Sequence, residues 1–209
     1  MFRNKKKLIL FDLDGVLIDS EKNMKFSWLK VKNKFLIKKS FDEYKKYLGM
    51  SFLDILNSLK IINNKKDIET YYKSISKLNI NLIKPFPDVV NTLSKLNKSN
   101  EIKIGILTSK DSQRTKIIVN KFFSKIKFHC IQSPNKKNRP KPAPDLILKI
   151  ISDMRIDPSE CCYIGDSKYD QEMCNRSNID FIYASYGYGG SSVKSKYFVK
   201  KISDIFKIL

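Results

Sequence analysis

Two aspartates at the end of an apolar run are the first residues of this chain that could do chemistry. Asp12 follows the uninterrupted run from Leu8 to Phe11, the pattern of a strand buried on both faces of a parallel sheet. Asp14 comes two residues later, and Gly15 permits a sharp turn beside it. Ligands bind outside the carboxyl ends of such strands. Two carboxylates on one loop repel each other unless a cation intervenes, and Mg²⁺ meets that need. The alternative interpretation is a solvated turn after a strand.

A second pair of candidates follows the apolar stretch 102–107. Thr108 and Ser109 stand between this predicted strand and a predicted helix from about Asp111 to Asn120. Hydroxyls and backbone N–H groups at the start of a helix bind anions well. The same pattern is also typical of a simple helix cap, so this signal alone leaves both interpretations open.

Three charged residues occur in two short motifs further along the chain. Lys141 lies in Lys-Pro-Ala-Pro-Asp, where the prolines hold it in a stiff, extended segment. Asp166 ends another apolar run, in Gly-Asp-Ser-Lys-Tyr-Asp, and Asp170 follows one helical turn later. If the strands before Asp12 and Asp166 are parallel neighbours, their carboxylates meet around one cation.

Taken in order, these stretches resemble the four motifs of the haloacid dehalogenase-like superfamily, beginning with Asp12-Leu13-Asp14-Gly15-Val16-Leu17. The resemblance covers essentially the whole chain. It implies an α/β fold, with a Rossmann-like parallel sheet core and an inserted α-helical cap domain. It also implies a Mg²⁺-dependent phosphatase that works through an aspartyl-phosphate. In that scheme Asp12 is the nucleophile, Asp14 is the general acid and base, and Lys141 neutralises charge. Thr108, Ser109 and Lys141 bind the substrate phosphate. The metal ligands are Asp12, the backbone carbonyl of Asp14, Asp166 and Asp170.

The order of the predicted elements supports an insert. Only helical periodicities follow the first strand, and strands alternate with helices again after Pro85-Phe86-Pro87. We therefore expect residues 18–85 to form the helical cap, and 1–17 with 86–209 to form the catalytic core. Within the cap, Ser40 and Glu43 predict a capping box, and Gly49 is expected to end that helix. A strand near 179–184 and a last strand and helix are expected to close the chain.

Composition limits the partners. The 209 residues include 42% hydrophobic residues, enough for one sizeable core and a smaller module. The sequence contains neither a membrane-spanning run nor a secretory signal, so we expect a cytoplasmic protein. The net charge of +20 is spread along the chain. We therefore expect it to attract a small phosphorylated metabolite, and we expect neither nucleic acid nor a membrane as the main partner. The four cysteines are expected to be reduced packing residues, and His129 a packing residue.

Several questions stay open within the resemblance. A dehalogenase is disfavoured because those enzymes lack the second acid, which is Asp14 here. A sugar phosphomutase remains an alternative, although Met24 and Phe52 stand where such mutases carry His and Arg. A catalytically silent binding protein is the other alternative. Asp88 departs from the glycine that commonly follows the cap, and the loop 185–190 is either a phosphatase-like feature or a glycine turn. The substrate, phosphoglycolate-like or a sugar phosphate, and the oligomeric state are undetermined.

Overall fold

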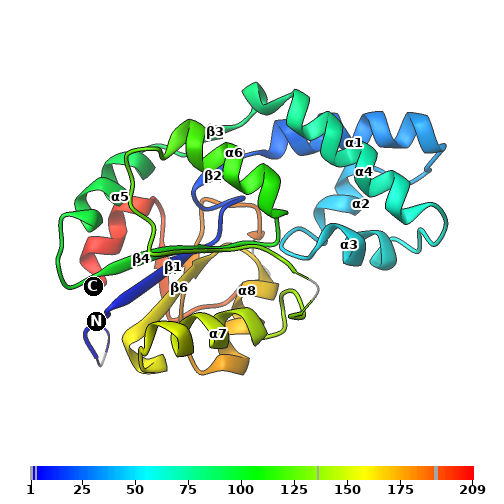
Figure 1. Ribbon diagram of the computed structural model, residues 1–209. Helices are drawn as coiled ribbons and strands as arrows, with labels where there is room; N and C mark the ends of the chain where they lie inside the picture. Colours follow the sequence, from blue (N-terminus) through cyan, green and yellow to red (C-terminus); the bar gives the residue numbers. More distant parts are fainter. Residues whose placement is uncertain (1, 3, 136, 191–192) are drawn as a thin grey trace.

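The computed structural model describes residues 2, 4–135, 137–190 and 193–209. The chain is an α/β protein built on a six-stranded sheet in which every neighbouring pair of strands is parallel, which confirms the predicted fold class (Figure 1). In spatial order, the strands are β5 (Cys130–Gln132), β4 (Lys103–Leu107), β1 (Leu8–Phe11), β6 (Cys161–Gly165), β7 (Asp180–Ala184) and β8 (Tyr197–Val199).

The apolar sequence of the central strand β1 is explained by its burial on both faces of the sheet. Its side chains are fully buried and alternate between two hydrophobic cores, one on each face of the sheet. Ile9 and Phe11 contribute to the core under α5 (Val89–Asn97), α6 (Ser112–Phe122) and the 3₁₀ helix η4 (Ile202–Lys207). Leu8 and Leu10 contribute to the core under α7 (Asp145–Met154) and α8 (Lys168–Ser177), on the opposite face in Figure 1. The short 3₁₀ helix η2 (Pro158–Glu160) leads into β6.

The segment between β1 and α5 forms a helical unit at one end of the molecule, coloured blue to cyan in Figure 1. It contains α1 (Glu21–Phe35), α2 (Phe41–Lys45), α3 (Phe52–Ser58), α4 (Lys65–Leu78) and the 3₁₀ helix η1 (Ile80–Leu82). These helices enclose a hydrophobic core of their own, centred on Trp28, Leu56 and Tyr72. We call residues 18–85 the insert.

Both ends of the insert run through a small antiparallel ribbon that the sequence did not predict. Strands β2 (Ile18–Asp19) and β3 (Lys84–Pro85) pair with each other. Strands of two residues are too short to show a periodicity, which is why the pattern missed them. The ribbon brings the two connections of the insert side by side.

The predictions for individual helices and turns were partly confirmed. The capping box of α2 is present, since Glu43 N donates to Ser40 Oγ (3.1 Å) and Ser40 N donates to Glu43 Oε2 (2.8 Å). The helix nevertheless ends at Lys45, earlier than the expected Gly49. The final helix is a 3₁₀ helix. Asp88 adopts φ +63°, a left-handed conformation that glycine enters without strain.

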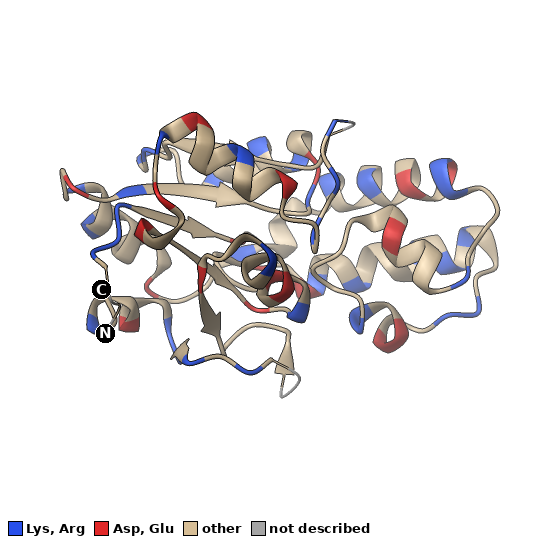
Figure 2. Ribbon diagram, turned by 90° about the horizontal axis from the view of Figure 1, so that it is seen from below, with Lys and Arg blue, Asp and Glu red and all other residues tan. Residues whose placement is uncertain are grey.

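The cysteines and charges lie as the sequence suggested. All four cysteines are free, and Cys161 and Cys162 begin the buried strand β6. His129 precedes β5 and is exposed, so the expectation of a packing residue was wrong; its Nδ1 accepts from Ile104 N (3.3 Å) beside β4. Lysine and arginine are distributed over both the core and the insert (Figure 2). Among the described residues, every helix is too short or too polar to cross a membrane.

Candidate active site

Three aspartates converge at the carboxyl end of the sheet, as the sequence predicted. Asp12 follows β1, Asp166 follows the neighbouring strand β6, and Asp170 lies in the first turn of α8. One carboxylate oxygen of each lies within 4.8 Å of the others. The three residues are between 0% and 4% exposed, so water screens little of their mutual repulsion. We call Asp12, Asp166 and Asp170 the acidic cluster.

Lys141 supplies positive charge to this cluster. Its Nζ lies 3.0 Å from Asp12 Oδ1 and 2.9 Å from Asp170 Oδ1, and it donates to the hydroxyl of Tyr163 (2.5 Å). Burial alone would lower the pKa of Lys141, but the carboxylates of Asp12 and Asp170 outweigh it and raise that pKa. Lys141 is therefore a permanent cation at the centre of the site.

The charge of the cluster fits a divalent cation. Three carboxylates and one ammonium group leave two negative charges in excess when all are ionised. Burial raises the pKa of Asp12 to about 7 despite Lys141, and burial with the carboxylates of Asp170 and Asp12 raises the pKa of Asp166 far above its usual value. Both raised pKa values reflect how poorly the surrounding protein groups stabilise the charged forms of Asp12 and Asp166. Hard carboxylate oxygens are the ligands that Mg²⁺ prefers, so the residues present fit that ion.

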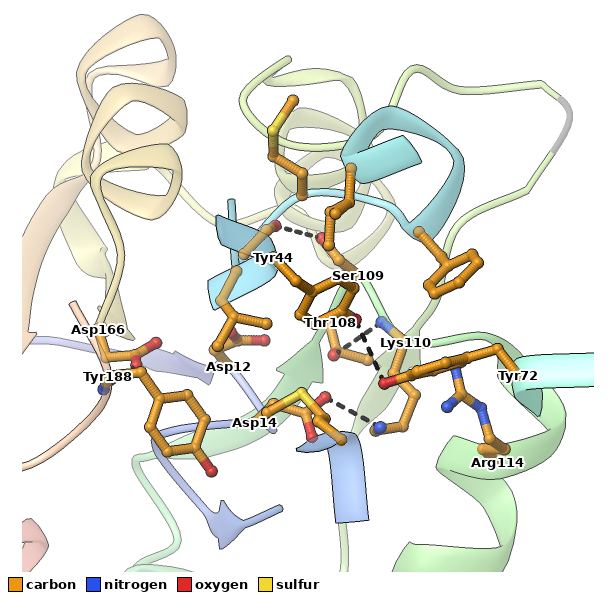
Figure 3. A pocket seen from close by; sticks show the side chains of 16 residues that line it. Asp12, Asp14, Tyr44, Tyr72, Thr108, Ser109, Lys110, Arg114, Asp166 and Tyr188 are labelled. Atoms are coloured by element: carbon orange, nitrogen blue, oxygen red, sulfur yellow. Dashed lines mark hydrogen bonds and ion pairs between the residues drawn. The ribbon is translucent and has the colours of Figure 1, made fainter. Parts of the chain in front are cut away.

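Asp14 does not join the acidic cluster through its side chain. Ser20 Oγ donates to Asp14 Oδ1, and Lys110 Nζ lies 3.2 Å from Asp14 Oδ2. Lys110 is buried, and burial lowers its pKa although Asp14 opposes the shift. In Figure 3, a dashed line joins Asp14 to Lys110, and Asp166 lies to their left. The Asp14 carboxylate thus lies outside the acidic cluster and is held between a hydroxyl and an ammonium group.

Thr108 and Ser109 follow β4 at the same edge of the sheet. Both side chains line the cavity that Asp12 faces. Thr108 Oγ1 accepts from Lys110 N (3.2 Å), and Ser109 Oγ donates to the carbonyl of Gly49 in the insert (2.6 Å). Thr108 therefore belongs to the site together with the aspartates, while Ser109 also joins the core to the insert.

The cavity has a volume of about 60 Å³ and is enclosed by residues of both the core and the insert. Its core residues are Asp12, Asp14, Thr108, Ser109, Lys110, Arg114, Asp166 and Tyr188, and its insert residues are Met24, Tyr44, Leu48, Gly49, Met50, Phe52, Ile55 and Tyr72. This size suits a small ligand in contact with Asp12 and Asp166.

Two positively charged residues that line the cavity were not identified from the sequence. Lys110 lies just before α6 and Arg114 lies in its first turn, and both side chains line the cavity. Arg114 is held by Asp111 Oδ2 (2.5 Å) and donates to Ser76 Oγ (3.0 Å), and its Cζ lies 5.4 Å from the centre of the Tyr72 ring. Their position shortly after Thr108 was the one sequence feature that could have identified them as residues of the site.

The loop 185–190, left open by the sequence, contacts the site. Tyr188 N donates to Asp166 Oδ2 (2.6 Å), and the Tyr188 hydroxyl accepts from Ser20 N (2.7 Å). One residue thereby joins the acidic cluster to the beginning of the insert. The loop is more than a glycine turn.

Comparison with known proteins gives consistent results at three levels. A family model described as haloacid dehalogenase-like hydrolase matches residues 9–184. Phosphoglycolate phosphatase of Aquifex aeolicus is 27% identical over 186 residues, covering 87% of this chain and 86% of that protein. Pyrophosphatase PpaX of Oceanobacillus iheyensis is 24% identical over 212 residues, covering 97% and 96%. Among solved structures, a haloacid dehalogenase-like hydrolase of Streptococcus pneumoniae has a TM-score of 0.85 at 18% identity, covering 97% and 98%, which shows a common fold.

Gly15 provides a test of how tightly the turn after Asp14 packs on the acidic cluster. It adopts φ +83°, and a Cβ at this position would lie 2.1 Å from Asp166 Oδ2. Gly190 also has a positive φ, +60°, but a Cβ there would have no atom within 4 Å. We expect Gly190→Ala to lower the free energy of unfolding by about 1 kcal/mol from the backbone alone. Gly15→Ala should lower it by about 1–3 kcal/mol more, because Asp166 must move. Urea unfolding with EDTA present measures both, and equal losses would show that the contact with Asp166 is unimportant.

Proposed function

Because this chain belongs to the haloacid dehalogenase-like hydrolase family, we propose that it is a Mg²⁺-dependent phosphatase acting through an aspartyl-phosphate intermediate. The observation that carries the proposal is the buried acidic cluster with Lys141 at its centre, at the carboxyl ends of two adjacent parallel strands. The proposed substrate is a small phosphorylated metabolite, and the proposed role of the insert is that of a cap over the cavity. The four free cysteines fit a reducing compartment such as the cytoplasm.

In the proposed mechanism, Asp12 is the nucleophile. Leu13 N donates to Asp12 Oδ1 (2.8 Å), and Lys141 Nζ contacts the same oxygen, so the carboxylate is held in one orientation. An Asp12 oxygen attacks phosphorus, and the bond from phosphorus to the ester oxygen breaks. Water then attacks the phosphorus of the aspartyl-phosphate and releases inorganic phosphate. Hydrolysis is thereby divided into two displacements.

Asp14 serves both displacements as the general acid and base. It gives a proton to the leaving oxygen in the first step and takes one from the attacking water in the second. Its contacts with Ser20 and Lys110 hold its carboxylate in the wall of the cavity, which supports this role. Separation from the acidic cluster leaves it available for this exchange.

Charge on the transferring phosphoryl group requires compensation, and this chain offers several groups for it. Lys141 provides a buried positive charge, and Thr108 and Ser109 provide hydroxyls next to the start of α6. Asp12, Asp166 and the backbone carbonyl of Asp14 would hold Mg²⁺, with Asp170 in support. When bound, the ion supplies further positive charge for the phosphoryl oxygens.

The cavity favours a substrate with a second anionic group. Lys110 and Arg114 place two positive charges in its wall beyond Asp14. The names of the two relatives, phosphoglycolate phosphatase and pyrophosphatase, both denote substrates with a second acid group beside the scissile phosphoryl. Met24 and Phe52, where the sugar phosphomutases carry His and Arg, both line this cavity, which supports a hydrolase.

The first prediction concerns the two proposed reacting carboxylates. We expect Asp12→Asn and Asp14→Asn each to lower kcat for p-nitrophenyl phosphate by at least about 10³-fold, because nucleophile and proton donor cannot be replaced by an amide. Asp153→Asn, on the exposed side of α7, is the matched control and should retain full activity. Circular dichroism would check the fold of each variant. Near wild-type turnover in both site variants would end this proposal.

The second prediction concerns the metal. EDTA should abolish phosphate release, and millimolar Mg²⁺ should restore it. Because a ligand of the folded state stabilises it, Mg²⁺ should also raise the thermal midpoint of the EDTA-treated protein by about 5 °C. Asp166→Asn should remove this shift, which calorimetry measures without any turnover. Unchanged phosphate release in EDTA would contradict metal dependence.

The third prediction concerns substrate choice. Lys110→Met should lower kcat/KM for 2-phosphoglycolate by about tenfold more than for ethyl phosphate, because both have an alkoxide leaving group but only the former carries a second anion for Lys110. Since both leaving groups need a proton, an effect of the variant on Asp14 changes both rates alike and cancels in the ratio. Lys116→Met, exposed on α6, should leave the ratio unchanged. An equal loss for both substrates would rule out this role for Lys110.

A further inference from the structure

The proposed mechanism gives no role to the buried hydroxyl of Tyr163, which lies beside Lys141. Tyr163 lies in the middle of β6 and is fully buried, facing the core that α7 and α8 cover. Its hydroxyl lies at the point where Lys141, Asp170 and the end of β4 meet, with contacts to Lys141 Nζ (2.5 Å), Asp170 Oδ1 (3.3 Å) and the carbonyl of Leu107 (2.8 Å).

The direction of these hydrogen bonds follows from the chemistry of the groups. A phenol has one proton to donate, and Lys141 has only donors. The Tyr163 hydroxyl donates to the Leu107 carbonyl and must therefore accept from Lys141. Because the phenol keeps its proton in the hydrogen bond to the Leu107 carbonyl, it is a neutral acceptor for Lys141.

A neutral acceptor does something for Lys141 that a carboxylate cannot. Asp12 and Asp170 each hold Nζ, but they also cancel part of its positive charge. Tyr163 restrains Nζ without adding negative charge. Moreover, Leu107 directly precedes Thr108, so the phenol connects the lysine to the strand end that carries a proposed phosphate ligand. The distance between the two phosphate-binding groups is thereby set by the interior of the sheet.

We propose that Tyr163 is a positioning residue for Lys141, holding its ammonium group in place for the phosphoryl group without cancelling any more of its positive charge. The proposal rests on the proposed function of Lys141. It predicts that the contribution of Tyr163 to catalysis passes through Lys141 and disappears when the lysine is absent.

The test is a double-mutant cycle of Tyr163→Phe and Lys141→Met, measured with Mg²⁺ and p-nitrophenyl phosphate under single-turnover conditions, so that slow variants remain measurable. Tyr163→Phe should slow the chemical step by about tenfold, the effect of losing one hydrogen bond to a charged group, with little change in the enzyme concentration giving half the maximal rate. In the Lys141→Met background the same change should alter the rate by less than about twofold.

Two controls separate this role from a structural one. Tyr71→Phe, in helix α4 of the insert, removes a half-buried phenol away from the site and should keep the wild-type rate. Thermal midpoints of all variants show whether each is folded at the assay temperature. A similar rate loss from Tyr163→Phe in both backgrounds, or no loss in either, would overturn the positioning role. If Asp12→Asn retained activity, the proposed function itself would fail instead.

Discussion

Repulsion among buried carboxylates is the constraint on which this structure depends. The acidic cluster places Asp12, Asp166 and Asp170 in a region that excludes water, where like charges interact most strongly. The protein offsets this with Lys141 and with backbone donors from Leu13 and Tyr188. The compensation is incomplete, as the raised pKa values of Asp12 and Asp166 indicate. A site of this kind is suited to holding a cation and a phosphoryl group, since their charges complete its balance.

The sheet was predictable to the extent that its strands are buried on both faces. β1 has the predicted bounds because all four of its side chains pack in a core, and the strand ends where the first charge appears. Elements that are held in place by tertiary contacts were harder to predict from the sequence. The ribbon of β2 and β3 has two residues a strand, and its pairing joins segments about 65 residues apart. Helix α2 ends at Lys45 although no sequence signal stops it there.

The residues of the site also fall into a group that the sequence identified and a group that it did not. Asp12, Thr108, Lys141 and Asp166 stand at strand ends or in a distinctive motif, so type and position together identified them. Their joint contribution to one site follows from the parallel order of β4, β1 and β6. Lys110, Arg114, Tyr163 and Tyr188 were missed because ordinary roles explain each of them: a lysine before a helix, an arginine on a helix, a tyrosine in a strand and a tyrosine in a loop. Only the three-dimensional contacts distinguish them.

Contacts between the core and the insert connect substrate choice to the geometry of the reacting groups. Ser109 Oγ donates to the Gly49 carbonyl, Arg114 donates to Ser76 Oγ, and the Tyr188 hydroxyl accepts from Ser20 N. Each contact begins at a core residue that lines the cavity and ends on the insert. The last of them reaches Ser20, whose hydroxyl donates to Asp14. Any shift of the insert relative to the sheet must therefore alter the surroundings of Asp14 and the cavity wall together. A ligand that fills the cavity and keeps the insert in this position also keeps the proposed proton donor in its place, so recognition and chemistry depend on one arrangement of the two parts.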